Sequence, residues 1–391
     1  MIQIQDKNVE NQVYFPKSTN IEGDLVLKLH SELTQKDYTF DVVNESKTSN
    51  YYKFSLNFKS VENGEYTYFI NDTDSGLIRI GNVNEAVSTS TYIDGIEVVQ
   101  YYPQDVRETD YSKEPLTFKI LSYGTINWTT SDSSNTKTIE YKLNDGEWTH
   151  ITSNTEPSAS AIVVTRGNKI QFRGNNTSYS DGLSYNTFGS STAEFEVEGN
   201  IMSLIYGDNF KNKLTINDYA FGGLFRACAN LVSAENLILP ATTVAYYCYY
   251  YMFYGCSSLT SAPKLPATTL ANFCYFGIFW NCKSLSAAPA LPATTLASKC
   301  YSFMFQGCSS LTTAPELPAT TLADSCYQYM FYGCTSLNYI KCLATDISAT
   351  SCTTNWVNGV ASTGTFVKSP NMNDWTRGGD GVPSGWTVID A

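Results

Sequence analysis

The residues with the greatest chemical potential in this chain are its eleven cysteines, which all lie between Cys228 and Cys352. Thiols at regular positions can bind metal ions, form disulfides, act as nucleophiles or pack as small apolar groups. Cys228 is an early copy of a pattern that then repeats every 26 residues in two series, eight residues apart. The series are Cys248, Cys274, Cys300, Cys326 and Cys352, and Cys256, Cys282, Cys308 and Cys334.

The spacing argues against a metal site. Zinc sites use Cys-x-x-Cys pairs or neighbouring histidines, whereas His30 and His150 lie far from the cysteines in the sequence. Disulfides between stacked units are geometrically allowed, because stacked strands lie about 4.8 Å apart and bridged Cα atoms about 4.4–6.8 Å apart. Free thiols fit the same register. We expect free thiols because no secretory signal follows Met1, which favours folding in the cytoplasm, where cysteines stay reduced. A trimmed export protein is the alternative.

Catalytic groups are scarce. Nucleophilic catalysis needs a nucleophile beside a base and an orienting group, and two isolated histidines in strand-like sequence do not supply them. Paired carboxylates could hydrolyse glycosides, but the repeats carry few acidic residues, among them Glu316, Asp324 and Asp346. We therefore expect no enzyme activity, no cofactor and no metal ion.

Tyrosine is the residue type that indicates binding. The chain has 28 Tyr and 20 Phe, and amphipathic rings can stack on sugars or anchor a protein partner. Tyr275, Tyr301 and Tyr327 each follow a cysteine at one register, so we expect them to pack between units. Irregularly placed aromatic residues of the repeats are the candidate exposed ligand contacts: Tyr250, Tyr254, Trp280 and Tyr332.

These residues belong to a repeat that cannot bury its own apolar face in a single unit. Strict self-similarity predicts a stacked solenoid over residues 201–354, with about 4.8 Å per coil if one strand per unit joins a parallel sheet. Residues 355–391 depart from the pattern and carry three tryptophans, as a terminal cap would. The expected core positions are Phe253, Phe279, Phe305 and Phe331, and Leu265, Leu291, Leu317 and Leu343.

The first 200 residues alternate apolar and polar side chains, which predicts half-buried strands. Leu25, Leu27 and Leu29 fall on one face of such a strand. Asn144-Asp-Gly146 separates two alternating segments and predicts a hairpin, because Asn and Gly accept a positive φ. The absence of a helical stripe favours antiparallel β-sandwiches.

Two such sandwich domains are expected, over residues 1–108 and 112–200, with a polar linker at 108–115. Residues 201–391 carry nine basic and nine acidic side chains, so the whole net charge of −12 belongs to residues 1–200. An acidic region joined to a neutral one offers no basic stripe, which argues against nucleic-acid binding. No stretch approaches about 18 apolar residues, so we expect no membrane insertion.

The segment Met304-Phe-Gln-Gly-Cys-Ser-Ser-Leu-Thr312, with Pro-Ala-Thr-Thr-Leu closing each unit, resembles the BspA-type leucine-rich repeat. In that family the cysteine points inward and the Leu-Thr stretch forms the strand. The present unit is longer and has Pro-Glu-Leu-Pro at the strand end. The resemblance implies a mainly β chain of two immunoglobulin-like sandwiches, a short leucine-rich-repeat solenoid and a C-terminal cap.

Two further resemblances concern the first 200 residues. The segment from Thr138 to Val197, running into 199–208, resembles a module that precedes such repeats in surface proteins of gut Bacteroidetes and their phages. The first domain, with Gly64-Glu-Tyr-Thr-Tyr68 and Gly76-Leu-Ile-Arg-Ile-Gly81, is similar to N-terminal domains of structural proteins of crAss-like phages.

Together these resemblances imply a phage virion protein made in the host cytoplasm, as a head or tail fibre or a decoration. Its first domain would dock on other virion proteins, and its repeats would present an adhesive surface to a host protein or gut glycan. A homo-oligomer such as a trimer is compatible with that role. A bacterial cell-surface adhesin of gut Bacteroidetes is the alternative.

Overall fold

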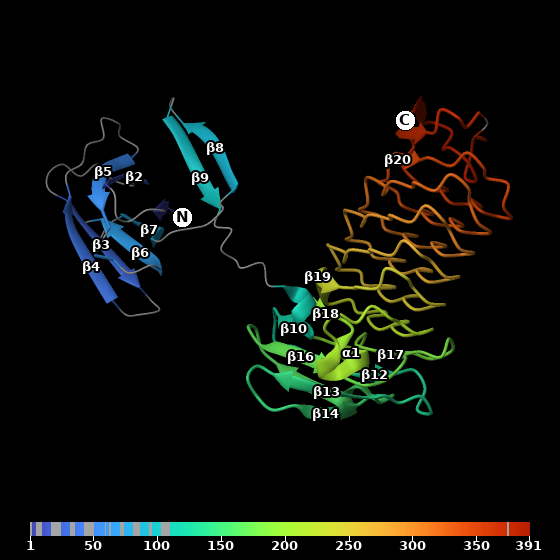
Figure 1. Ribbon diagram of the computed structural model, residues 1–391, viewed down its shortest axis with the longest axis horizontal. Helices are drawn as coiled ribbons and strands as arrows, with labels where there is room; N and C mark the ends of the chain where they lie inside the picture. The colour runs from blue at the N-terminus through green and yellow to red at the C-terminus, as the bar shows by residue number, and fades with distance from the viewer. Residues whose placement is uncertain are drawn as a thin grey trace. The chain divides into compact units, whose positions relative to one another are not determined.

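The chain divides into two compact units, Met1–Thr109 and Asp110–Ala391, and among the described residues of each unit strands outnumber helical turns (Figure 1). This confirms the prediction of a mainly β protein, and the division falls inside the segment expected to be a linker. None of the described helices has the length and apolar character needed to cross a bilayer. The computed structural model describes residues 2–4, 10–16, 25–31, 36–42, 51–58, 60–61, 64–70, 74–80, 87–93, 96–102, 110–373 and 375–391.

The first unit contains a five-stranded sheet in the order β1-β7-β6-β3-β4 and two strand pairs, β2-β5 and β8-β9. Leu25, Leu27 and Leu29 are fully buried on one face of β3, which confirms the predicted alternation. His30, also on β3, lies 2.6 Å from the Asp37 carboxylate on β4, measured from Nδ1 to Oδ1. The strands are β1 (Ile2–Ile4), β2 (Glu10–Pro16), β3 (Leu25–Ser31), β4 (Lys36–Val42), β5 (Tyr51–Asn57), β6 (Gly64–Ile70), β7 (Asp74–Ile80), β8 (Val87–Ile93) and β9 (Ile96–Tyr102).

The second unit begins with a sheet region, residues 110–200, built on a six-stranded sheet in the order β14-β13-β16-β10-β18-β19. Asn144 turns the chain between β13 and β14 with a φ of 53°, as predicted for the hairpin. The segment after β18 forms one short helix, α1 (Ser203–Tyr206). The strands of the region are β10 (Leu116–Ile120), β11 (Gly124–Asn127), β12 (Thr129–Thr130), β13 (Thr138–Leu143), β14 (Thr149–Thr152), β15 (Ala161–Val164), β16 (Lys169–Arg173), β17 (Asn186–Thr187) and β18 (Phe195–Asn200).

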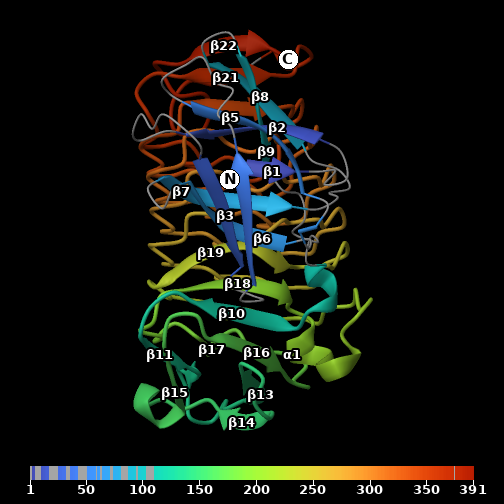
Figure 2. The same cartoon turned by 90° about the vertical axis from the view of Figure 1, so that its left-hand side faces the viewer.

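The sheet region and the repeats share one sheet and one core. β18 pairs in parallel with β19 (Leu231–Ile238), the first strand of the repeats, so β10, β18 and β19 follow one another up the stack (Figure 2). Phe118 of β10 stacks on Phe195 of β18 with ring centroids 4.6 Å apart. A single hydrophobic cluster runs from Leu116 to Trp386, so residue 200 is no boundary in this unit.

Each repeat is a coil containing a turn segment of unusual regularity. Alternate N–H groups donate to the next coil, as from Tyr249 to the carbonyl of Cys274 at 3.0 Å. The N–H groups between them donate within the segment to the carbonyl three residues earlier, as from Met252 to Tyr249. Every fourth residue has a positive φ, so two residues face the core and the next two face outward.

The inward residues form ladders along the stack. Phe225, Phe253, Phe279, Phe305 and Phe331 stack with successive ring centroids 5.3 to 5.7 Å apart. The expected packing of Tyr275, Tyr301 and Tyr327 is confirmed, since each is 1% exposed.

The cysteines stand in the same inward positions. All eleven are free and buried, which confirms the expectation of stacked thiols. In the second series the Sγ atom donates to a phenylalanine carbonyl of the preceding coil, as from Cys334 to Phe305 at 2.9 Å. Cys342 lies outside both series: it pairs with Leu317 and is fully buried, whereas Leu343 is only partly buried. The register therefore slips by one residue, and the assignment of Leu343 to the core column is wrong.

The strand that the leucine-rich-repeat resemblance implies for every unit is not formed in every coil. Within the described residues of the stack, strands occur only at its start, as β19, and at its end, as β20 (Tyr339–Cys342) and the two strands that follow it. The coils between them make isolated bridges such as Ser233 with Ser261. Proline explains the difference, because it has no N–H to donate to a ladder. The intermediate coils carry two prolines each at this place: Pro263 and Pro266, Pro289 and Pro292, and Pro315 and Pro318.

The last coil passes into a three-stranded parallel sheet formed by β20, β21 (Thr365–Lys368) and β22 (Thr387–Asp390). Trp356 continues the inward ladder, lies 6.1 Å from Tyr327 and donates its indole N–H to the carbonyl of Gly381 at 2.8 Å. Trp386 donates in the same way to Ala361 at 2.7 Å. The turn pattern thus continues beyond residue 354 and is closed by tryptophans that tie the end of the chain back to it.

Burial makes the thiols poor nucleophiles, and this can be measured. Burial raises the pKa of Cys228 and Cys334 to about 12, and the thiolate is the reactive form. We expect a thiol reagent at about pH 8 to label the native protein slowly. Cys352 should be labelled first, because it is 3% exposed while the other cysteines are fully buried. Mass spectrometry after labelling gives the order.

The same reagent in denaturant without reductant should label all eleven cysteines. Several disulfides in that unreduced sample would contradict the thiol ladder.

Candidate functional site

The outward positions of the turn segments form straight columns along the stack. The outer column is formed by the residue that lies two positions before each cysteine of the second series, and by the equivalent residue in the first and last coils. Backbone bonds hold it in register: the N–H of Gly255 donates to the carbonyl of Trp280, and that of Gly307 to Tyr332. The outer column consists of Arg226, Tyr254, Trp280, Gln306, Tyr332 and Asn358.

Three of the four predicted contact residues belong to the outer column. Tyr332 is exposed, and Tyr254 and Trp280 are half-buried. The rings of Tyr254 and Trp280 meet edge to face with centroids 5.2 Å apart. The structure therefore brings these three side chains onto one surface, although they lie far apart in the sequence.

Tyr250 does not belong to that exposed surface, and its prediction as an exposed contact is wrong. It is 4% exposed, and burial raises its pKa to about 12. Its hydroxyl lies 3.2 Å from Ser180 Oγ in the sheet region, and its ring approaches Gly222, where a Cβ atom would come within 2.4 Å. Tyr250 faces outward from its own coil but is covered by the sheet region, which the sequence pattern did not indicate.

A second column of aromatic side chains extends this surface. Phe303 stacks on Trp280 at 5.2 Å and on Tyr329 at 4.8 Å, and Tyr329 contacts Tyr332 at 5.6 Å. Tyr251 lies 5.9 Å from Trp280 on the other side. We call these five residues, together with Tyr254, the aromatic surface.

Three members of the aromatic surface are held in a backbone conformation that disfavours them. Tyr251, Phe303 and Tyr329 have φ values of 53°, 59° and 55°. The left-handed region costs a residue with a side chain roughly 1–2 kcal/mol. Gly223 and Gly277 occupy the equivalent places in other coils. Bulky rings kept at strained positions indicate a role beyond folding, because glycine would satisfy the backbone.

Tyr251 and Tyr329 belong to the tyrosine-rich stripe seen in the sequence but were not predicted as contacts, and Phe303 and Arg226 were not singled out. The signal that could have found them is a period of four inside each unit, seen as the inward pairs of Cys300-Tyr-x-x-Met-Phe-x-x-Cys308. This period belongs to neither a strand nor a helix. The pattern therefore reads as irregular when only those two periods are considered.

Arg226 begins the outer column and is its only charged member. Its guanidinium carbon lies 4.8 Å from the centroid of the Tyr185 ring and 5.0 Å from that of Tyr254. Its Nε atom is buried and has no hydrogen-bond partner. The outer column thus carries one cation, which contacts two rings, at the end nearest the sheet region.

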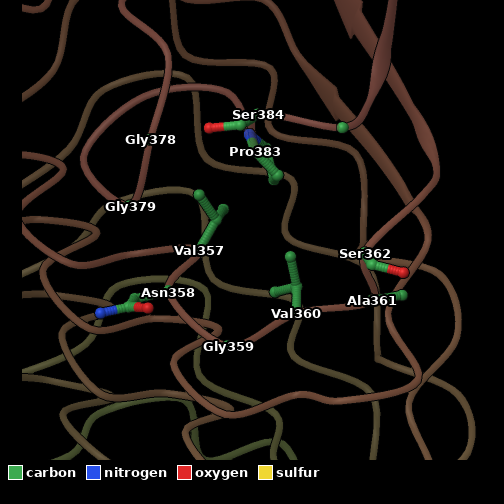
Figure 3. Close-up of a pocket in the computed structure, with 11 residues that line it drawn as sticks. Val357, Asn358, Gly359, Val360, Ala361, Ser362, Gly378, Gly379, Pro383 and Ser384 are labelled. Carbon is green, nitrogen blue, oxygen red and sulfur yellow. The ribbon is translucent and has the colours of Figure 1, made fainter.

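A pocket of about 290 Å³ lies near the other end of the stack (Figure 3). Asn358 of the outer column contributes to its wall with Ser362 and Ser384, and glycine backbone supplies much of the remainder. No lining residue is titratable, so the pocket offers no side-chain acid or base. Across the described parts of the chain, no three His, Cys, Asp or Glu side chains are grouped as a metal site requires.

No protein-family model matches this chain, and comparisons with curated proteins and with solved structures return no match.

The strain at the outward positions predicts a stabilising substitution. Ser351 is exposed with a φ of 55°, so Ser351→Gly should raise the free energy of unfolding by up to about 1 kcal/mol, since glycine accepts this conformation without steric cost. Ser258 is equally exposed but lacks a positive φ, so Ser258→Gly should lower it by about 0.5–1 kcal/mol. Thermal and urea unfolding of the two variants measure the contrast, and equal losses in both would refute the strain argument.

Proposed function

We propose that this is a non-enzymatic binding protein whose aromatic surface attaches to a host cell, through a surface protein or a glycan. The observation that carries the proposal is the row of tyrosine, tryptophan and phenylalanine side chains on the outside of a rigid stack, three of them at strained backbone positions. Rings of this kind give a large contact area with little loss of side-chain entropy.

The surroundings of the aromatic surface support recognition. Ring-to-ring contacts link its members from Tyr251 to Tyr332, so it is preorganised and little ordering is needed on binding. The repeats carry balanced charge, so contact would depend on shape and apolar area more than on long-range attraction. Tyrosine and tryptophan are the residues that most often dominate binding energy.

The biological setting that we propose is a phage particle. The stacked coils are interpreted as a BspA-type leucine-rich-repeat solenoid, and residues 1–108 and 112–200 as immunoglobulin-like sandwiches. The separation of the first unit at Thr109 supports a docking module that is independent of the recognition module. A cell-surface adhesin of gut Bacteroidetes is the second candidate; detection of the protein in purified virions by mass spectrometry distinguishes the two.

Truncation of the aromatic surface tests the binding role. Alanine at Tyr254, Trp280 and Tyr332 should each weaken attachment roughly thirtyfold, because hot-spot rings contribute about 2 kcal/mol or more. Alanine at Thr268, Thr294 and Thr320 is the matched control and should leave attachment unchanged; all three are exposed, the first two in the coils of Tyr254 and Trp280 and the third in the coil before that of Tyr332. Attachment is measured as binding of labelled full-length protein to host cells.

Melting temperature separates lost binding from lost folding. Phe305→Ala, in the buried ladder, should cost about 3–5 kcal/mol of stability, whereas the three surface variants should melt close to the unmodified protein. Undiminished attachment by the triple variant Tyr254→Ala, Trp280→Ala, Tyr332→Ala would show that the ligand binds elsewhere.

A further inference from the structure

We infer that Arg226 is an oxyanion-binding residue at one end of the outer column, and that the ligand is a carboxylated glycan whose sugar rings continue along Tyr254 and Trp280. This inference rests on the proposed function and specifies its ligand class. It uses a residue that no sequence pattern indicated.

The site around the Arg226 side chain is formed by residues from three different parts of the fold. Tyr185 comes from the loop that precedes β17, Arg226 from the first coil and Tyr254 from the second. The two rings lie 4.8 and 5.0 Å from the guanidinium carbon, within the range of a cation–π contact. A planar cation held by two rings can still donate from its terminal N–H groups, and it loses little side-chain entropy when it does.

Close packing against the sheet region fixes the backbone of Arg226. Thr187 Oγ1 donates to the carbonyl of Arg226 at 3.3 Å. Gly189 approaches the same carbonyl so closely that a Cβ atom would lie 2.0 Å from the oxygen. Gly223 leaves room for the ring of Tyr185, which a Cβ atom there would meet at 2.8 Å. The sheet region and the first coil therefore fit together around this arginine.

The guanidinium lacks the acceptors that partly buried arginines usually have. Arg173 pairs with Glu140 at 2.7 Å and with Asp208 at 2.6 Å, and Arg377 donates to the carbonyl of Trp386 at 2.8 Å. Among the described residues Arg226 has no ion pair, and its side chain donates no hydrogen bond to the protein. An arginine without a counterion favours an external carboxylate, which can accept two parallel N–H bonds.

The neighbouring residues favour a sugar over other carboxylates. Beyond Arg226 the column continues with Tyr254 and Trp280, and then with Gln306, whose Oε1 atom is buried without a hydrogen-bond partner. The two rings that follow the arginine suit the apolar faces of sugars. From Arg226 to Gln306 is three coils, or about 14 Å at roughly 4.8 Å per coil, which requires an extended ligand. A polyphosphate chain such as a nucleic acid would require several cations, and this column has one.

Binding of defined oligosaccharides to the full-length protein tests the inference. The probes are an oligomer of galacturonic acid, the neutral galactose oligomer of the same length and a glutamate peptide of equal charge. We expect the acidic oligomer to bind about tenfold or more tightly than the neutral one, since a charge-assisted pair replaces neutral contacts. Arg226→Gln should abolish this preference, and Arg226→Lys should restore part of it.

The matched control is Arg166→Gln, which removes one positive charge from an exposed position in the sheet region. It should leave the preference intact. An unchanged preference in Arg226→Gln, equal effects of the two glutamine variants, or a peptide that binds as tightly as the acidic oligomer would each overturn the inference. If Arg226→Gln fails to fold, full preference in Arg226→Lys would overturn it and a partial preference would support it.

The outcomes also separate this inference from the proposed function. Binding to host cells that depends on Tyr254, Trp280 and Tyr332 but shows no preference for carboxylated sugars would refute the inference alone. Loss of acidic preference in Arg226→Gln, with host-cell binding unaffected by the three alanine substitutions, would refute the proposed function and leave the arginine site.

Discussion

One hydrogen-bonding pattern determines the structure of the repeats. Alternate N–H groups of each turn segment donate to carbonyls of the next coil, and the N–H groups between them close turns of four residues within the segment. The pattern satisfies the backbone of the segment without a helix or a sheet. It also fixes a period of four, with two residues inside and two outside. The ladder of thiols and rings in the core and the columns on the surface follow, because each side chain lies beside its counterpart one coil away.

The positive φ that this pattern requires at every fourth residue has a steric cost, and two kinds of residue reduce it. Where the outward residue of each four is glycine, as at Gly307 and Gly333, the left-handed backbone is free of strain. Where it is aromatic, as at Phe303 and Tyr329, stacking on a neighbouring coil offsets part of the strain. The register between the coils thus both places the rings of the aromatic surface side by side and keeps them in fixed positions.

Most of the fold could be predicted from the sequence where one physical period dominates. Alternation identified the strand that contains Leu25, Leu27 and Leu29, and the 26-residue repeat identified the stack and its buried rings. A strand does not form in each coil because paired prolines remove backbone N–H donors. Leu343 was wrongly assigned to the core because the register slips by one residue at this coil. At the site, Tyr254, Trp280 and Tyr332 could be found as deviations from the repeat. Tyr250 and Arg226 could not, because their surroundings come from the sheet region, more than 35 residues away in sequence.

The separation of inside from outside, two residues at a time, bears on how such a chain evolves. A substitution in the outer column leaves the ladder beneath it untouched, and each coil contributes one column position. Residues as unlike as Arg226, Trp280 and Asn358 therefore share one backbone geometry. The outer column can therefore change coil by coil through point mutation, or lengthen by duplication of a unit of 26 residues, without change to the core.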